Sequence, residues 1–172
     1  DDLLNWRRIS KSPVLETSLP YEFDPTRTVN NYVEMRDVTM TELPDGAVEG
    51  IFTARIDSGP HTGRGVLGRA HTNDMIRWDL GEPIFSPGIF NVIEVPSRYS
   101  SNGRHYLLYC VNSYLESHLG NNTYPNMRFC TGYAMSDRYD DGFTFVSDQV
   151  LGIGDAYVGR IVDAGGETPF IH

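Results

Sequence analysis

The sequence predicts an all-β chain, because its apolar segments are short and turn signals separate them. Helical periodicity is nearly absent, and clusters of Gly, Pro, Asn and Asp interrupt the apolar runs roughly every ten residues. Four turns stand out, and in three of them Asp-Gly or Asn-Gly supplies the positive φ angles that tight hairpins need. These turns lie at residues 44–46, 101–103, 140–142 and 164–166.

The chain also repeats itself. Residues 2–6 (Asp-Leu-Leu-Asn-Trp) return at 74–78 (Asp-Met-Ile-Arg-Trp), and the pattern of residues 68–74 returns at 132–137. A period of roughly 60–70 residues with about four strands in each unit is typical of propeller blades. We therefore expect a β-propeller, and a β-sandwich with chance internal similarity is the alternative.

Counting strands places two whole blades and two partial ones along the chain. We expect a blade tail at 1–15, a blade at 33–80, a blade at 91–146 and a partial blade at 157–172, with links at 12–15, 82–86 and 149–152. The expected strands lie near 34–42, 48–56, 65–72 and 77–80, and near 91–99, 104–112, 127–135 and 143–146. Such a set cannot close a ring alone, so we expect an incomplete propeller that the remainder of a longer chain or another chain completes.

Composition restricts the function. The 172 residues suit a single domain, and a hydrophobic fraction of 40% is that of a folded protein. The formal charge of −9 and the lack of any basic run exclude a nucleic-acid groove. No apolar run approaches the roughly 18 residues of a membrane span. The chain begins at Asp1 without Met, so a signal peptide that has been removed is compatible with the sequence.

No metal or cofactor is expected. The histidines share no ligand spacing, and two cysteines, Cys110 and Cys130, form no metal motif. Each cysteine lies in an apolar run that is predicted to be a strand. A disulfide and two buried free thiols are both compatible with this placement.

The first strand of each blade lines the central channel of a propeller. Each predicted first strand carries a charged residue among apolar ones: Asp37, Glu94 and Arg160, with Arg36 beside the first. We place these three at the same point of three successive units, where their side chains would converge. The alternative is local ion pairing, of Arg36 with Asp37 and of Arg160 with Asp163.

Glu94 is the candidate acid. Its apolar neighbours Ile93 and Val95 are expected to desolvate the carboxyl group, which favours the protonated form that a general acid needs. The alternative is a solvent-facing Glu94, or one paired with Arg98. Two carboxyl groups across a pocket, Asp37 and Glu94, suit glycoside cleavage.

The motifs at these positions resemble those of the five-bladed propeller glycosidases. Arg36-Asp37-Val38 and Glu94-Val95-Pro96 head successive blades, and the Asp-x-x-x-Trp segments end them. The nearest resemblance is to glycoside hydrolase family 32, the β-fructosidases, with family 43 as a close relative. It implies retaining cleavage of β-fructofuranosidic bonds in a carbohydrate such as sucrose or a fructan, without a cofactor.

The resemblance also implies roles for single residues. Asp37 would stabilise the transition state, and Glu94 would be the general acid and then the general base. Arg36, Tyr157 and Arg160 would bind the substrate, with the last two in a less specific Tyr-x-x-Arg segment.

The sequence departs from the family pattern in three places. Val38 stands where the family has Pro, and Val95 stands where it has Cys. The Asn-Asp-Pro motif that carries the nucleophile is absent, since Asn73-Asp74 lacks the Pro. We expect the nucleophile upstream of Asp1. The alternatives are an inverting, family 43-like arabinosidase or xylosidase, and a non-catalytic carbohydrate-binding propeller.

Two connecting segments are further candidates for sugar contact. Residues 112–126 are rich in Tyr and Asn, and residues 21–24 (Tyr-Glu-Phe-Asp) precede Arg36. Such side chains suit stacking and hydrogen bonding to sugars. An ordinary surface loop is the alternative for both.

Overall fold

The structure is a computed structural model of the chain. It describes residues 4–8, 10–11, 13–28, 31–111, 130–151, 157–162 and 170–171, without the side chains of 147–150 and 170. Two single-turn 3-10 helices are present in this part of the chain, η1 (Pro25–Arg27) and η2 (His61–Gly63). No helix in the described ranges is long and apolar enough to cross a membrane. The remaining regular structure is β, as expected.

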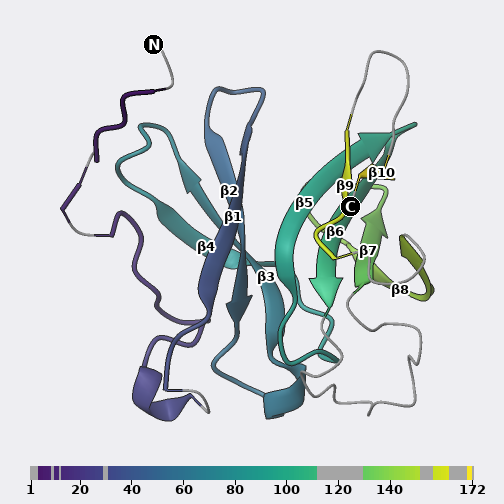
Figure 1. Cartoon of the computed structure of the whole chain (residues 1–172), viewed down its shortest axis with the longest axis horizontal. Helices are drawn as coiled ribbons and strands as arrows, with labels where there is room; N and C mark the ends of the chain where they lie inside the picture. The colour runs from purple at the N-terminus through teal and green to yellow at the C-terminus, as the bar shows by residue number, and fades with distance from the viewer. Residues whose placement is uncertain are drawn as a thin grey trace.

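The strands form two four-stranded antiparallel sheets and one small sheet (Figure 1). In both larger sheets the spatial order follows the chain order, so each sheet is a meander of the kind found in propeller blades. The first sheet holds β1 (Met35–Glu42), β2 (Val48–Arg55), β3 (Gly65–Thr72) and β4 (Asp79–Phe85). The second holds β5 (Glu94–Ser101), β6 (Arg104–Val111), β7 (Cys130–Ser136) and β8 (Thr144–Leu151). β9 (Arg160–Ile161) pairs with β10 (Phe170–Ile171).

The fourth strands are longer than the sequence predicts. Residues 82–85 belong to β4 and residues 149–151 to β8, where we expected links between blades. Pro83 favoured a link because it has no N–H to donate to a sheet. β4 is an edge strand, however, and a proline is tolerated there.

The first strands of the two sheets share one irregularity. The pairing of β1 with β2 shifts register after Arg36, and that of β5 with β6 shifts after Glu94. The following residues, Asp37 and Val95, have left-handed φ angles of 58° and 51°. Val158, shortly before β9, has a φ angle of 64°. The sequence therefore builds the same bulge at the head of successive blades.

A hydrogen bond marks the equivalence of these positions. The N–H of Val95 donates to Oγ1 of Thr53 over 3.2 Å, and the N–H of Val158 donates to Sγ of Cys110 over 2.9 Å. Thr53 in β2 and Cys110 in β6 occupy matching places, because each is the cross-strand partner of the residue just before a bulge. In both cases a side chain from the second strand of a sheet accepts a hydrogen bond from a backbone N–H at the start of the following blade.

This equivalence corrects one expectation from the sequence. Asp37, Glu94 and Arg160 do not occupy the same point of three units. Arg36, Glu94 and Tyr157 are equivalent, each just before a left-handed residue. Equivalent positions are defined by cross-strand pairing and by the place of the bulge, and short sequence repeats show neither.

The main core lies between the two larger sheets. β2 has seven buried residues in succession, so it is covered on both faces. Fully burying an aliphatic side chain contributes about 1.5–3 kcal/mol, and this cluster joins one blade to the next. Its members are Ile51, Leu67, Ile84, Phe85, Phe90, Ile93, Leu107, Tyr109, Val111, Cys130 and Ala134.

Each sheet places an aromatic ring over a glycine of the next strand. Phe52 pairs with Gly68 in the first sheet, and Tyr109 pairs with Gly132 in the second. A Cβ atom on Gly68 would lie 2.2 Å from the Phe52 ring, and one on Gly132 would lie 3.0 Å from Tyr109. A side chain at Gly68 would displace the Phe52 ring, and one at Gly132 would crowd the Tyr109 ring, so the aromatic residue and the glycine form one repeated unit of the blade.

A buried ion pair also joins the two sheets. Nη2 of Arg98 in β5 donates to Oε2 of Glu49 in β2 over 2.6 Å. Both side chains are at most 5% exposed. The guanidinium of Arg98 also lies over the ring of Tyr139, 3.9 Å from its centroid. The contact fixes the first strand of one blade against the second strand of the other.

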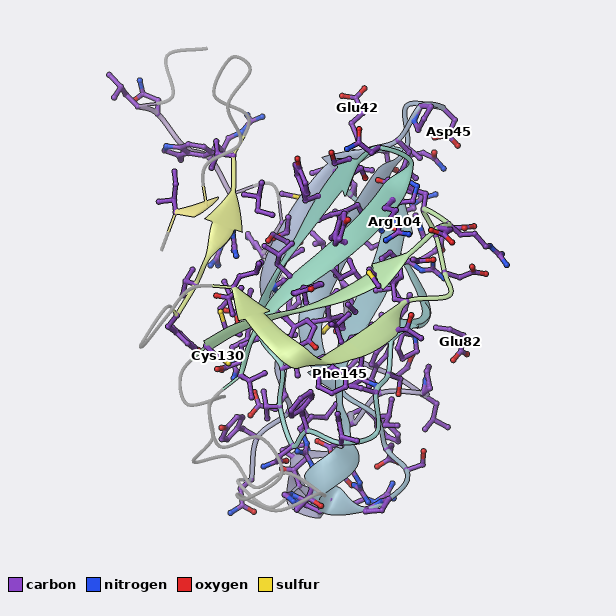
Figure 2. All side chains as sticks on the ribbon, turned by 90° about the vertical axis from the view of Figure 1, so that its right-hand side faces the viewer. Glu42, Asp45, Glu82, Arg104, Cys130 and Phe145 are labelled. Atoms are coloured by element: carbon purple, nitrogen blue, oxygen red, sulfur yellow. The ribbon has the colours of Figure 1, made fainter. Side chains whose placement is uncertain are left out.

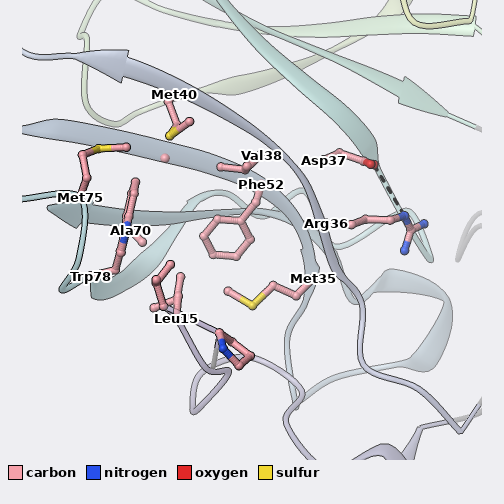
Figure 3. A pocket seen from close by; sticks show the side chains of 13 residues that line it. Leu15, Met35, Arg36, Asp37, Val38, Met40, Phe52, Ala70, Met75 and Trp78 are labelled. Carbon is pink, nitrogen blue, oxygen red and sulfur yellow. Dashed lines mark ion pairs between the residues drawn. The ribbon is translucent and has the colours of Figure 1, made fainter. Parts of the chain in front are cut away.

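The opposite face of the first sheet borders an apolar cavity of about 460 Å³ (Figure 3). Phe52, Ala70 and Trp78 line it together with Leu15 and Met35. By strand pairing, Phe52 and Ala70 match Tyr109 and Ala134 of the second sheet, which pack against the first sheet. The cavity therefore lies on the face of the first sheet that corresponds to the face with which the second sheet packs against its neighbouring blade.

Candidate functional site

The candidate site lies where the first strands of the two larger sheets run side by side (Figure 1). Oγ1 of Thr39 in β1 donates to the backbone oxygen of Pro96 in β5 over 2.6 Å. The bulges at Asp37 and Val95 are thereby brought together. Residues separated by about 58 positions in the sequence meet at this junction.

Arg36 lies at the centre of the site. Its Nη2 donates to Oε1 of Glu94 over 2.5 Å, and its Nε lies 3.6 Å from Oδ2 of Asp37. It also forms an ion pair with Glu34, whose side chain is only 5% exposed. One guanidinium thus contacts three carboxyl groups. Arg36 itself is 37% exposed, so the cluster faces an opening.

Glu94 is held at both oxygens. Oε1 accepts from Arg36, and Oε2 accepts from the hydroxyl group of Tyr157 over 2.5 Å. Burial, and then the hydrogen bond to Glu94, raise the pKa of Tyr157 well above its usual range. The Tyr157 hydroxyl therefore keeps its proton and remains a donor at neutral pH. The Glu94 side chain is 14% exposed, so one side stays accessible.

Asp37 is held at one oxygen. Its Oδ2 accepts from Oγ1 of Thr53 over 3.1 Å and from the N–H of Val95 over 3.3 Å. The left-handed backbone at Asp37 turns its side chain toward β5. Asp tolerates this conformation better than most residues, but Val95 is β-branched and is strained there. Such strain is typical of functional sites.

Arg160 bonds to backbone rather than to a carboxyl group in the described part of the chain. Its Nη1 donates to the backbone oxygen of Val95 over 3.1 Å and to that of Gly159 over 3.3 Å. It therefore supports the β5 bulge from the side of β9. Asp163, its expected alternative partner, lies outside the described residues.

Two residues of this cluster, Glu34 and Thr53, were not predicted from the sequence. Glu34 is buried beside Arg36, and its position two residues before the arginine gave a weak signal. Thr53 is fully buried in β2, 16 residues from Asp37. Only the pairing of β1 with β2 brings it to the site, so no local pattern could have identified it.

Two residues of the segment at 21–24, Tyr21 and Glu22, have structural roles, whereas Phe23 is 44% exposed. Tyr21 is 1% exposed and packs in the second core cluster. Glu22 is buried and forms ion pairs with Arg55 at 3.0 Å and Arg64 at 3.2 Å. Neither side chain is available to a sugar. The other candidate segment, 112–126, lies outside the described residues.

The cysteines are both buried free thiols. Cys130 is the cross-strand partner of Val111, and Cys110 is that of Thr131. Paired residues point to the same face of a sheet, so Cys110 and Cys130 point to opposite faces and cannot form a disulfide. Among the described residues, no group of three His, Cys, Asp or Glu side chains is placed to hold a metal ion.

The chain is similar in structure to enzymes of known fold. No protein-family model matches it, and no curated protein matches its sequence. An inulosucrase from Halalkalicoccus jeotgali bound to kestose superposes with a TM-score of 0.64 and 19% identity, over 83% of this chain and 39% of that protein. A mutant levansucrase of B. subtilis gives 0.59 and 15%, over 79% and 41%. A levansucrase from Gluconacetobacter diazotrophicus gives 0.54 and 15%, over 76% and 32%.

These similarities establish the fold. The chain is an all-β, incomplete β-propeller, as the sequence predicts, and the β-sandwich alternative is wrong. It spans about two fifths or less of the length of these neighbours. The named neighbours are an inulosucrase and levansucrases, so the similarity supports the propeller fold and does not single out family 32.

Proposed function

We propose that this chain forms part of the active site of a glycosidase-type enzyme that cleaves β-fructofuranosidic bonds, as in sucrose or a fructan. One observation carries the proposal: the single guanidinium of Arg36 bridges Asp37 and Glu94, which belong to different blades. Glycoside cleavage needs a carboxyl group as its acid, and a second carboxyl group beside it suits stabilisation of the positive charge that develops on the sugar. The inulosucrase and levansucrase neighbours support the substrate class.

In the first step Glu94 acts as the acid. A carboxylate nucleophile, which this sequence does not identify, attacks the anomeric carbon while Glu94 gives its proton to the departing oxygen and the glycosidic bond breaks. For Oε1 of Glu94 to carry this proton, Arg36 must first release it, and its contacts with Glu34 and Asp37 remain to hold the guanidinium. Asp37 accepts hydrogen bonds from sugar hydroxyls and stabilises positive charge on the ring.

In the second step Glu94 acts as the base, in the arrangement that the structure holds. It takes a proton from water or from a sugar hydroxyl, whose oxygen attacks the anomeric carbon and releases the nucleophile. Arg36 and Tyr157 donate to the two Glu94 oxygens and keep the carboxylate oriented. Water yields hydrolysis, and a sugar acceptor yields transfer.

The test is Glu94→Gln in the complete protein, assayed with sucrose and with a fructan. Loss of the proton donor and base is expected to lower kcat by about 10²–10⁴-fold while circular dichroism stays unchanged. Glu42→Gln is the matched control, because Glu42 is exposed at the far end of β1 beside the hairpin (Figure 2). Wild-type turnover in Glu94→Gln would end the assignment.

Product analysis separates the alternatives. Retention at the anomeric carbon supports the fructosidase-like mechanism, and inversion supports a family 43-like arabinosidase or xylosidase. Sugar binding by the complete protein without turnover of any of these substrates would identify a non-catalytic carbohydrate-binding propeller.

A further inference from the structure

The hydroxyl group of Thr53 connects the two halves of the site. Thr53 lies in β2, and its side chain is fully buried. Its Oγ1 lies 3.1 Å from Oδ2 of Asp37 and 3.2 Å from the backbone nitrogen of Val95. Val95 follows Glu94 directly. One side chain of the first sheet therefore contacts the Asp37 carboxyl group and the backbone beside the Glu94 carboxyl group.

The chemistry of the groups fixes the direction of these hydrogen bonds. A backbone N–H can only donate, so the Thr53 oxygen accepts from Val95. A hydroxyl group has one proton, and the proton of Thr53 is left for Asp37. The Val95 N–H also reaches Oδ2 of Asp37, at 3.3 Å, which closes a triangle. Among the described residues, Oδ1 of Asp37 accepts no hydrogen bond and is left for a substrate.

The second sheet shows the same contact without a carboxyl group. Cys110 takes the place of Thr53, and its sulfur accepts the N–H of Val158 over 2.9 Å. Val95 takes the place of Asp37, so no carboxyl group needs a donor there. A thiol is a weak donor and a hydroxyl group is a strong one. The stronger donor, the Thr53 hydroxyl group, is thus present in the first sheet, where the bulge carries the carboxyl group of Asp37.

We propose that Thr53 is a positioning residue for Asp37. It orients the carboxylate so that Oδ1 faces the sugar, and it holds that carboxylate at a fixed place relative to Glu94. This inference rests on the proposed function, because it assumes that Asp37 contacts the substrate.

The chain itself supplies the informative variant. Thr53→Cys introduces the residue that the second sheet already has at this position, so the N–H of Val95 keeps an acceptor and the blade is expected to fold. The donor to Asp37 is weakened. In the complete protein acting on sucrose, we expect kcat to fall about 10–100-fold with KM changed less than about 3-fold. Thr53→Ser keeps the hydroxyl group and is expected to stay within about 3-fold of wild type.

A double-mutant cycle identifies the partner of Thr53. If Thr53 acts through Asp37, Thr53→Cys is expected to change the residual kcat of Asp37→Asn by less than about 2-fold. Thr72→Val controls for loss of a buried hydroxyl group in the same sheet, because Thr72 bonds to the turn at Asp74 and Met75. It is expected to lower stability without changing kcat.

The outcomes distinguish this inference from the proposed function. Thr53→Cys with kcat near wild type, or a full Thr53→Cys effect in the Asp37→Asn background, would overturn the positioning role alone. Wild-type turnover in Asp37→Asn would show that Asp37 is not part of the mechanism, and the role of Thr53 would fall with it.

Discussion

The bulges of β1 and β5 share a backbone conformation but differ in chemistry. Asp37 and Val95 have nearly the same left-handed φ angle, and the Thr53 side chain of β2 forms a hydrogen bond with each of them. The carboxyl group of Asp37 accepts a hydrogen bond from the Thr53 hydroxyl group, whereas Val95 has an apolar side chain and donates its backbone N–H to Thr53. The repeated fold thus sets the backbone conformation at both bulges, and the side chain at each bulge determines its chemical role.

The largest expected effect comes from making the first bulge like the second. Asp37→Val is expected to lower kcat of the complete protein on sucrose by about 10²–10³-fold, since the charge that we propose to stabilise the transition state is lost. Valine adopts this conformation at a cost of about 1 kcal/mol, and Val95 shows that the fold tolerates that cost at the equivalent place. Glu42→Val makes the same chemical change at the exposed end of β1 and serves as the control. Equal kinetics for the two variants would contradict the role of Asp37.

The second prediction concerns the buried ion pair that joins the two larger sheets. Arg98→Met leaves Glu49 buried without its arginine, so we expect the free energy of unfolding to fall by about 3–5 kcal/mol. Arg104→Met removes an exposed ion pair with Asp137, which is 88% exposed, and is expected to cost less than about 1 kcal/mol. Denaturant unfolding measures both. Similar losses in the two variants would show that the Glu49 contact does not join the sheets.

The third prediction compares the two cysteines. Burial raises the pKa of Cys130 from an ordinary 9.0 to about 11. The folded state holds this proton more tightly than the unfolded state does, so its contribution to stability is full below pH 9 and is lost as the pH rises to about 11. A shift of two pKa units corresponds to about 3 kcal/mol.

Thermal unfolding at pH 8 and pH 10.5 tests this. Between these two pH values, the Cys130→Ala variant is expected to lose less stability than the wild-type protein. Burial also raises the pKa of Cys110, but the N–H of Val158 opposes this by stabilising the thiolate. Cys110→Ala should therefore reduce the alkaline loss by less. A larger change for Cys110→Ala would refute the comparison.

The smallest expected effect concerns strain. Val95→Gly removes a β-branched residue from a left-handed position and is expected to raise stability by about 1 kcal/mol, after the added flexibility of the unfolded chain is subtracted. The N–H that Val95 donates to Thr53 is kept. The control is Val38→Gly on β1, where φ is not positive and a loss of stability is expected. Destabilisation by Val95→Gly of the same size as by Val38→Gly would show that no strain is stored there.

Much of the fold was predictable from local patterns. Turn residues and apolar runs located the strands, and the repeated segments indicated blades. The convergence of Arg36, Asp37 and Glu94 followed from placing first strands around a channel. Thr53 was not predictable, because its role depends on cross-strand pairing and on a bulge. Glu94 is the residue just before its bulge, whereas Asp37 follows the residue just before its own, so the two acids are offset by one position between their blades.

The ion pair between Glu49 and Arg98 has a consequence for the site. The two acids belong to separate sheets, so any sliding of one sheet along the other changes the gap between them. The buried charges resist such sliding, because even a small displacement would break a desolvated contact. Random substitutions near Arg98 should therefore reduce turnover without touching the sugar, and selection for a faster enzyme should find few tolerated changes there.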